Sequence, residues 1–321
     1  MSSGHKTVVS VMDIGGTHVT AASVDVETRS ILSGNTFREP LDGDGSAEEI
    51  LSAVARCVSC LPAPSGSRWA IALPGPFDYE LGIGRYAGVG KFDALRGFDL
   101  RAALTPLLPG AGSVSFHNDA EAFVLGEWWA GAARGHRSVV GITLGSGVGS
   151  SFVRDGYALR HGPGIPPEGR IDLLRYAGMP LEETVSRRAI RRAYARATGE
   201  APALDVREIA QRAQQGDRAA SGVFTQAFRA LGTVLGPLLP AFEATILVVG
   251  GSIAASWDLV AEPLRAGLAD AEPVRTAPIA LEPARHLAQA PLLGAAYLAT
   301  AADRDAAAEI GGRDDRRPPR R

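Results

Sequence analysis

The chain has 321 residues and is poor in cysteine. Its two cysteines, Cys57 and Cys60, are too few for a disulfide framework. They form the motif CVSC inside a segment with a helical pattern, without the second pair of ligands that a zinc site needs and without a redox-type loop. We therefore expect both cysteines to be ordinary helix residues.

Lysine is equally rare. Of the 33 basic residues only Lys6 and Lys91 are lysine, and the others are arginine. A phosphate loop of the form GxxxxGK[ST] needs a lysine that reaches the terminal phosphates, and the sequence has no such motif. If this protein binds a nucleotide, it must do so with backbone amides and a metal ion.

The sequence also lacks a large net charge and long apolar runs. The 33 basic and 35 acidic residues leave a formal charge of −2, which gives no general attraction for nucleic acid or for an anionic membrane. The sequence has no apolar run of about 18 residues, and its start lacks the features of a signal peptide. We expect a soluble cytoplasmic protein with no nucleic-acid partner and no membrane partner.

The chain does contain enough apolar side chain for a packed core. Hydrophobic residues make up 45% and charged residues 21%, which excludes a largely disordered protein. At roughly 100 to 200 residues per domain, the length predicts two modest domains or one large one.

One hairpin pattern occurs twice, about 130 residues apart. DIGGTHVTAASVD (residues 13–25) and TLGSGVGSSFVRD (residues 143–155) share the end of an apolar strand, a turn of small residues, a second strand and an acidic residue. Self-similarity over this distance predicts duplication of a whole domain rather than a short repeat.

The remaining pattern alternates between strands and helices. Further strands are expected at residues 69–73, 114–116 and 244–249, each with apolar or β-branched residues. Helices are expected from residue 46 and at residues 120–133, 181–198, 206–214, 217–239 and 291–302. This order predicts an α/β protein.

The glycine-rich turns suggest anion binding. Turns of glycine, serine and threonine leave backbone N–H groups uncovered, so that several can point at one phosphate. Two such turns would hold opposite sides of a nucleotide's phosphate chain. Each turn alone is equally explained by the ordinary preference of tight hairpins for glycine.

Several motifs together point to a known family. They are DIGGTH (residues 13–18), ALPGPFD (72–78), HNDAEAFVLGE (117–127), ITLGSGVGSSFV (142–153), VVGGS (248–252) and PLLGAAYLA (291–299). In this order they resemble the phosphate, catalytic, adenosine and closing-helix motifs of the ROK family of sugar kinases and repressors, within the hexokinase, actin and heat-shock chaperone superfamily.

The resemblance implies a two-lobed, actin-like ATPase fold of the ribonuclease H-like type, with duplicated domains and a cleft between the lobes. The small N-terminal lobe would span residues 1–117, with the helix at about 291–302 packing back on it. The large lobe would span 118–290, and residues 303–321 would form a disordered tail. A homodimer is the commonest symmetric assembly.

The resemblance also assigns roles near the nucleotide. Asp119 takes the place of the family's general base, which accepts the proton of a sugar hydroxyl as that oxygen attacks the γ-phosphate. Asn118 or Asp119 could instead be only the N-cap of the helix that follows. Asp13 would hold Mg²⁺ through water. Contacts to ATP would come from Gly15, Gly16, Thr17, His18, Thr143, Gly145, Ser146, Gly147, Gly250, Gly251 and Ser252.

On the sugar side the chain departs from the family. The usual zinc cluster of histidine and cysteines is absent from residues 166–186, so no zinc is expected. Glu168 would stand for the family's first sugar-contacting glutamate, while Arg170 replaces the histidine or that position is lost. Glu182 matches the second glutamate, although acids at a helix start have a purely structural explanation.

Two charges occupy a stretch where the family usually has an asparagine. Lys91 and Asp93 follow Gly88 and Gly90 there, and they would recognise a substituent that glucose lacks or form a solvated loop. With Asn118 and Gly75, they complete the expected sugar site.

We expect an ATP-dependent kinase that acts on the 6-hydroxyl of glucose or of an amino sugar. The alternatives are a non-catalytic sugar sensor and a kinase that uses polyphosphate. A repressor is disfavoured because twelve residues before Asp13 are too few for a winged-helix module.

Overall fold

The structure is a computed structural model that describes residues 7–88, 90–199, 203–271 and 279–301. It divides into two compact units. The first contains the described residues up to Ala122 and those from Pro291 onward, and the second spans Phe123–Ala290. The expected disordered tail at 303–321 lies outside the described residues.

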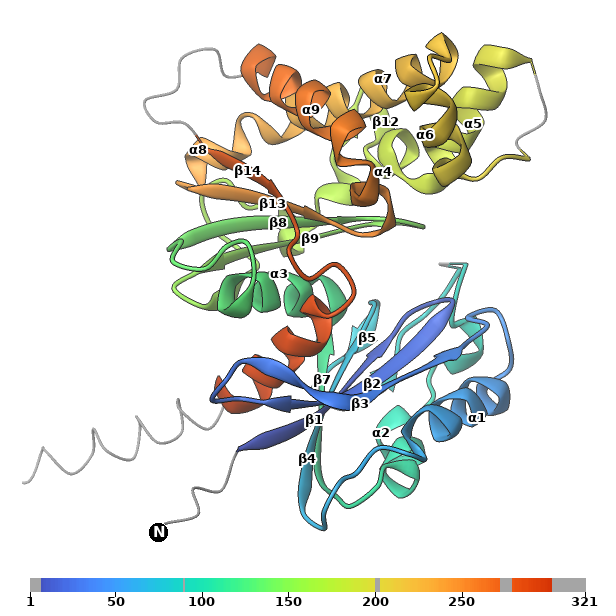
Figure 1. The fold of residues 1–321 in the computed structure, drawn as a ribbon, viewed down its shortest axis with the longest axis vertical. Coiled ribbons are helices and arrows are strands. Elements are labelled where there is room, and N and C mark those ends of the chain that lie inside the picture. Colours follow the sequence, from blue (N-terminus) through green and yellow to red (C-terminus); the bar gives the residue numbers. More distant parts are fainter. Residues whose placement is uncertain (1–6, 89, 200–202, 272–278, 302–321) are drawn as a thin grey trace, which may run out of the picture. The chain divides into compact units, whose positions relative to one another are not determined.

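The first unit is built on a mixed five-stranded sheet in the order β3-β2-β1-β4-β7 (Figure 1). β1 is antiparallel to β2 and parallel to β4, and β4 is parallel to β7. The strands are β1 (Val8–Ile14), β2 (His18–Asp25), β3 (Ser30–Pro40), β4 (Ser67–Leu73) and β7 (Ala111–Asn118). Smaller elements are the ribbon of β5 (Phe77–Asp78) and β6 (Ile83–Gly84), with α1 (Ala47–Val58), η1 (Asp93–Leu95), α2 (Leu100–Leu104) and η2 (Thr105–Leu107).

The second unit repeats this sheet. Its order is β10-β9-β8-β13-β14, with the same antiparallel and parallel pairings. The strands are β8 (Ser138–Leu144), β9 (Val148–Arg154), β10 (Tyr157–Leu159), β13 (Ile246–Gly250) and β14 (Ala280–Pro283). The duplication that the two hairpin motifs predicted is therefore present in the topology, strand for strand.

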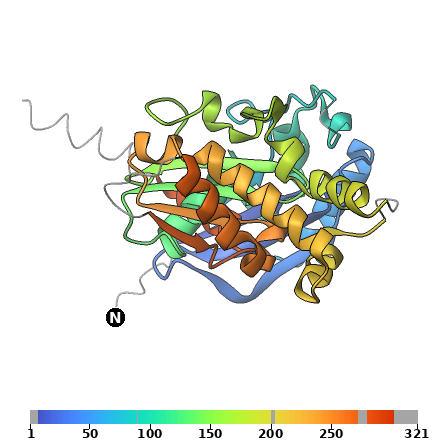
Figure 2. The same ribbon diagram turned by 90° about the horizontal axis from the view of Figure 1, so that it is seen from above.

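Most helices of the second unit lie in the chain between β10 and β13. They are α4 (Glu182–Val185), α5 (Arg187–Thr198), α6 (Val206–Gln214), α7 (Arg218–Leu235) and α8 (Leu238–Ala241), while α9 (Trp257–Ala271) lies between β13 and β14. Short pieces are η3 (Pro167–Gly169), η4 (Ile171–Leu173), η5 (Ser252–Ser256) and the ribbon of β11 (Arg175–Tyr176) and β12 (Met179–Pro180). α7 and α9 lie side by side over the sheet (Figures 1 and 2), and an added Cβ at Gly267 would lie 2.0 Å from the carbonyl oxygen of Arg229.

α3 (Asp119–Ala130) begins in the first unit and ends in the second. Within the second unit its backbone meets that of Ala290, because Gly126 has no side chain there. Residues 290–301 form a helix, and Gly294 lies so close to Ala122 that an added Cβ would be 1.7 Å from the Ala122 carbonyl oxygen. Glycine is therefore required by close packing at both positions.

α1 shows why the sequence forms a helix at this place. Ser46 accepts a hydrogen bond from the Glu49 amide while the Glu49 carboxylate accepts one from the Ser46 amide, a complete capping box. Cys57 lies on its buried face, and burial raises the pKa of its thiol to about 11, which keeps it protonated. Cys60 lies just beyond the end of the helix and is exposed.

Two expected helices are broken. The segment 181–198 divides at Ser186, whose extended backbone ends α4 and whose hydroxyl caps α5 by accepting a hydrogen bond from Ala189. The segment 217–239 divides after Leu235, at Gly236 and Pro237, because proline lacks the amide that the helix needs.

Candidate functional site

The first glycine turn joins β1 to β2. The Gly15 amide donates to the His18 carbonyl at 2.9 Å and closes the turn. Neighbouring chain braces it from outside, since the Leu41 amide donates to the Thr17 carbonyl and the Gly43 amide donates to the Gly16 carbonyl, both at 2.9 Å. This outside bracing uses carbonyl groups and adds no bond to the amides of the turn, of which the Gly15 amide is already used within the turn.

Neither backbone torsion nor packing requires most of the turn glycines. Gly15, Gly16, Gly145 and Gly147 do not have the left-handed backbone that favours glycine. An added Cβ would stay 3.4 Å or more from its neighbours at Gly15, Gly16 and Gly145. What glycine provides at these three positions is backbone with no side chain over it, although the amides of Gly15 and Gly145 already donate within their own turns, to the carbonyls of His18 and Gly147.

Asp13 and Asp119 form an acidic pair at the end of β1 and the start of α3. Burial, followed by the neighbouring Asp119 carboxylate, raises the pKa of Asp13 to about 7, against the opposing charges of Arg38 and Lys91. Burial also raises the pKa of Asp119, and Lys91 is the main opposing charge. Within the described chain no hydrogen-bond donor reaches the Asp13 carboxylate, and none reaches Oδ2 of Asp119.

At the start of α3, Asn118 and Asp119 have different roles. Oδ1 of Asn118 accepts hydrogen bonds from the amides of Ala120 and Glu121, both at 3.0 Å, so Asn118 caps the helix. Its Nδ2 donates to the Tyr79 hydroxyl at 3.0 Å. Asp119 is the first helical residue, and its Oδ1 accepts from the Ala120 amide at 2.9 Å. The capping role therefore belongs to Asn118 and leaves one oxygen of Asp119 available.

Other predicted residues of the first unit lie around this pair. Gly75 lies near the Tyr79 hydroxyl, which would be 3.4 Å from an added Cβ. Lys91 is half-buried, and its Cδ would be 3.4 Å from a Cβ at Gly16. Asp93 instead begins η1 in an exposed position. His18 is exposed, its Nδ1 lies 2.9 Å from the Thr17 hydroxyl, and desolvation followed by Arg38 lowers its pKa.

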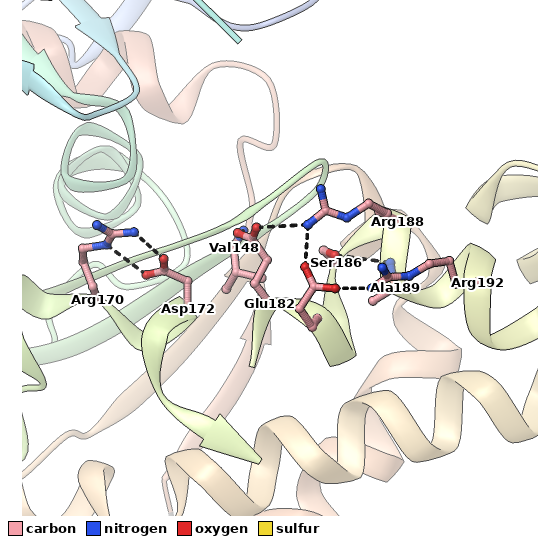
Figure 3. Close-up of polar contacts among 9 residues, drawn as sticks. Val148, Arg170, Asp172, Glu182, Ser186, Arg188, Ala189 and Arg192 are labelled. Atoms are coloured by element: carbon pink, nitrogen blue, oxygen red, sulfur yellow. Dashed lines mark hydrogen bonds and ion pairs between the residues drawn. The ribbon is translucent and has the colours of Figure 1, made fainter. Parts of the chain in front are cut away.

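The second glycine turn differs because a carboxylate occupies it. Oε2 of Glu182 accepts a hydrogen bond from the Val148 amide at 3.1 Å, next to Gly147 (Figure 3). Arg188 lies 3.8 Å from Glu182 and 2.6 Å from Glu183 and links the two acids. Glu182 therefore has two structural roles. It is an acid in the first turn of α4, and it accepts a hydrogen bond from the chain just after the second glycine turn.

The stretch that departs from the family forms a second charged group in the same unit. Arg170 donates from Nε and Nη2 to the two carboxylate oxygens of Asp172, at 3.2 and 2.6 Å (Figure 3). Glu168 is exposed, has a left-handed backbone with a φ of 57°, and lies 3.8 Å from His161. A positive φ at a non-glycine residue stores strain of the order of 1 kcal/mol. His161 supplies an imidazole near Glu168 that sequence spacing did not indicate.

Packing explains the glycines of the third motif better than ligand access does. A Cβ at Gly250 would lie 2.3 Å from the Phe123 ring, and one at Gly251, whose φ is 83°, would lie 2.3 Å from the Leu144 carbonyl oxygen. Ser252 begins η5, and α9 starts only at Trp257. A short 3₁₀ helix therefore separates the motif from α9.

The predicted residues fall into two sets, one in each unit. The first unit holds Asp13, Gly15, Gly16, Thr17, His18, Gly75, Lys91, Asp93, Asn118 and Asp119, and the second holds Thr143, Gly145, Ser146, Gly147, Glu168, Glu182, Gly250, Gly251 and Ser252. Sequence reasoning missed Arg38 on β3 and Tyr79. Arg38 carried no signal because β3 alternates between half-buried and exposed residues and lacks an apolar run.

The acidic pair suits a magnesium ion. Mg²⁺ prefers one or two carboxylates together with phosphate and water oxygens, and a cation would relieve the repulsion between Asp13 and Asp119. The described part of the chain contains no group of three or more histidine, cysteine, aspartate or glutamate residues that could hold a metal alone. The remaining ligands would therefore come from nucleotide and water.

Among the residues that the structure describes, none of the helices has the length and apolarity needed to cross a membrane.

Comparison with known proteins gives a family and its activities. The ROK family model matches residues 9–302. A glucokinase of Thermotoga maritima is 29% identical over 280 residues, which cover 81% of this chain and 86% of the relative. A beta-glucoside kinase of Klebsiella pneumoniae is 29% identical over 262 residues, which cover 76% and 82%.

A solved structure matches as well. The ROK glucokinase of Streptomyces griseus, in complex with glucose and AMPPNP, superposes with a TM-score of 0.74 at 26% identity, over 91% of this chain and 98% of that one. These relatives are sugar kinases with the actin-like fold that the motifs implied. With the family model spanning nearly all of its length, the chain belongs to the ROK family.

Proposed function

We propose that this protein is an ATP-dependent kinase that transfers the γ-phosphate to the 6-hydroxyl of a hexose, either glucose or an amino sugar. The observation that carries the proposal is the Asp119 carboxylate. Its Oδ2 has no donor in the described chain, and it lies at a helix start beside Asp13 and the first glycine turn.

Asp119 would act as the general base. Burial raises its pKa, which strengthens it as a proton acceptor, and the charge of Lys91 opposes that rise. The hydrogen bond from the Ala120 amide to Oδ1 fixes the carboxylate and leaves Oδ2 for the hydroxyl proton. Such a base contributes roughly 10² to 10⁴ in rate.

The nucleotide would be held by the two glycine turns. Gly16 and Thr17 would offer amides, and Thr17 a hydroxyl, to the phosphates, while Gly15, whose amide donates to the His18 carbonyl, would line the turn, with His18 at the edge. Thr143, Gly145, Ser146 and Gly147 would do so from the second unit, and Gly250, Gly251 and Ser252 would approach the adenosine. The AMPPNP complex of the Streptomyces griseus relative supports ATP as donor. Polyphosphate as donor remains the alternative.

Asp13 would hold Mg²⁺ through water. When bound, the ion would neutralise charge on the phosphates. The half-buried Asp13 carboxylate accepts no hydrogen bond in the described chain, so its oxygens are available for that water.

The sugar would contact Asn118, Asp119, Gly75, Glu168 and Glu182, with Lys91 and Asp93 as further candidates. The Nδ2 group of Asn118 is fixed by Tyr79, and Glu182 is fixed by the Val148 amide. The named relatives act on glucose and on beta-glucosides, so the family alone does not choose the sugar. We also propose that the protein is cytoplasmic and forms a homodimer.

A panel assay tests the proposal. The purified protein is given ATP and Mg²⁺ with glucose, glucosamine, N-acetylglucosamine or mannose, and the phosphorylated position is read by ³¹P NMR. We expect 6-phosphate from at least one of them. Asp119→Asn should lower the rate by roughly 10² to 10⁴.

Glu48→Gln is the matched control, since it removes an exposed carboxylate from the first turn of α1, and Glu48 is not among the charges that shift the pKa of Asp119. It should change the rate less than about threefold. A protein that binds sugar without sugar-dependent turnover would be the non-catalytic sensor, and this result would overturn the proposal.

A further inference from the structure

We propose that the ammonium group of Lys91 binds the phosphoryl group during its transfer. This inference rests on the proposed kinase function and assigns Lys91 to the phosphate rather than to a sugar substituent. Within the described residues Lys91 is the only lysine.

Lys91 is held against the first glycine turn by a short chain of hydrogen bonds. The Phe92 amide donates to the Gly43 carbonyl at 2.6 Å, and the Gly43 amide donates to the Gly16 carbonyl at 2.9 Å. Phe92 is 1% exposed and its ring contacts that of Tyr86, with centroids 5.4 Å apart. The backbone of Lys91 is therefore anchored from the core side.

The side chain then extends over the turn itself. Its Cδ would be 3.4 Å from a Cβ at Gly16, so the aliphatic stem covers the glycine. Gly90 and Phe92 both have left-handed backbones, with φ of 72° and 60°, which sets the direction in which Lys91 leaves the loop. The left-handed backbone at Phe92 is costly for a residue with a side chain. The buried Phe92, held in that conformation, therefore fixes the position of the neighbouring Lys91.

The ammonium lies near two acids but pairs with neither. In the described chain no carboxylate lies within 4 Å of it, although it acts electrostatically on both Asp13 and Asp119. A lysine with a purely structural role is normally paired or fully solvated, whereas Lys91 is half-buried. An anion bound above the turn would pair with the Lys91 ammonium. In the proposed reaction that anion is the terminal phosphate of ATP, because the hydroxyl that Asp119 deprotonates attacks it.

The chemistry of the step fits a cation at this position. The hydroxyl oxygen forms a bond to the γ-phosphorus, the bond from that phosphorus to the bridging oxygen breaks, and ADP leaves with the electron pair. Asp119 takes the hydroxyl proton, and Lys91 keeps all of its protons. Charge on the equatorial oxygens of the transferring group is what a fixed cation stabilises.

The test compares Lys91→Met, Lys91→Arg and Arg96→Met. Methionine keeps the aliphatic stem over Gly16 and removes the charge, and arginine restores it. Arg96→Met removes a cation from an exposed position five residues further on and serves as the matched control. Affinities for AMPPNP, ADP and the sugar are measured by calorimetry with Mg²⁺, and rates are measured on the best sugar of the panel.

Lys91→Met should lower kcat by about 10² and weaken AMPPNP binding by about tenfold, with ADP and sugar affinities within about twofold of wild type. Lys91→Arg should recover part of kcat, and Arg96→Met should behave as wild type. Equal losses for AMPPNP and ADP, or a loss confined to sugar affinity, would overturn the inference.

Two further results keep this test separate from that of the kinase function. An active wild type with an unaffected Lys91→Met refutes the role of Lys91 alone, whereas an inactive wild type refutes the kinase function. Thermal unfolding checks each variant, and Lys91→Gln replaces Lys91→Met if methionine prevents folding.

Discussion

The two glycine turns occupy the same place in two sheets of the same topology, yet their surroundings differ in charge. The first turn has Asp13 at the end of its strand, with Asp119 and Lys91 in electrostatic range. The second has Thr143 at the corresponding position, since both residues precede the last paired residue of their strand. A carboxylate in one copy is thus a neutral hydroxyl in the other.

The turns also differ in what their amides do. Glu182 occupies the Val148 amide after the second turn, whereas the first turn is braced through its carbonyl groups. The two units share one sheet topology, but the side chains around the two turns differ: Asp13 lies at the end of the strand before the first turn, and Glu182 contacts the chain just after the second. Topology alone therefore does not indicate which side chains surround each turn.

The largest expected effect comes from substituting the corresponding residues before the two turns, Asp13→Asn and Thr143→Val, and comparing the losses in rate. Asp13→Asn should lower kcat/KM by about 10² to 10³ and raise the Mg²⁺ concentration needed for half-maximal rate, because the proposed metal ligand is gone. Thr143→Val loses one neutral hydrogen bond and should cost about tenfold or less. Steady-state kinetics at several Mg²⁺ concentrations measure both.

Folding does not confound this comparison. A carboxyl group whose pKa is raised to about 7 costs stability when it is ionised at pH 8, so Asp13→Asn should be at least as stable there as wild type. Equal kinetic losses in the two variants would remove the proposed division between the copies.

A second comparison uses close backbone packing in each unit. Gly294→Ala in the first unit and Gly267→Ala in the second would place a Cβ within 1.7 and 2.0 Å of a carbonyl oxygen. Both should lower the free energy of unfolding by about 3 kcal/mol, because backbone must move to make room. Urea denaturation measures the change.

Gly222→Ala in α7 is the control. Apart from its chain neighbours and the backbone of its own helix, no atom of the described residues lies within 4 Å of its Cβ position, so alanine should stabilise this helix by about 0.5 to 1 kcal/mol. If Gly294→Ala behaves like Gly222→Ala, the close approach to Ala122 does not exist in solution.

The smallest expected effect concerns pH and belongs to the first unit. Burial lowers the pKa of His117 on β7 to about 4, and its Nε2 lies 2.9 Å from the Ser115 hydroxyl. An unfolded histidine gains a proton near pH 6.5, while the folded one stays neutral until about pH 4. Stability is therefore lost as pH falls from 6.5 toward 4, by about 2 kcal/mol at pH 5.

His117→Gln should remove that loss, and the measurement is the difference between wild type and variant in urea denaturation at pH 7.5 and pH 5. The difference is needed because Asp13 acts with the opposite sign: its raised pKa adds stability as pH falls from about 7 to 4. A difference that does not change with pH would show that the folded His117 also titrates normally.

Much of the fold was readable from local pattern. Apolar strands stopped by glycine turns predicted β1, β2, β8 and β9, because strands buried on both faces are continuous in sequence. β3 was missed because it alternates between half-buried and exposed residues. Helix breaks at Ser186 and at Gly236 depend on what the following segment packs against, which periodicity does not report.

For the candidate site, the sequence predicted residues but not their contacts. The resemblance of the motifs to the ROK family is what named Asp13, Asn118 and Asp119. That Asn118 takes the capping role, and so leaves an oxygen of Asp119 available, follows only from the hydrogen bonds at the start of α3. Asp93 was named together with Lys91, yet the two differ in exposure.

The sequence by itself determined the duplicated hairpins, the ROK family membership and the exclusion of a lysine phosphate loop, since each depends on residue types at fixed separations along the chain. Only the tertiary structure decided which charges meet. The pKa of Asp13, the place of Lys91 over Gly16 and the hold of Glu182 on the second turn all arise between residues far apart in the chain, and burial makes those encounters strong by keeping water away.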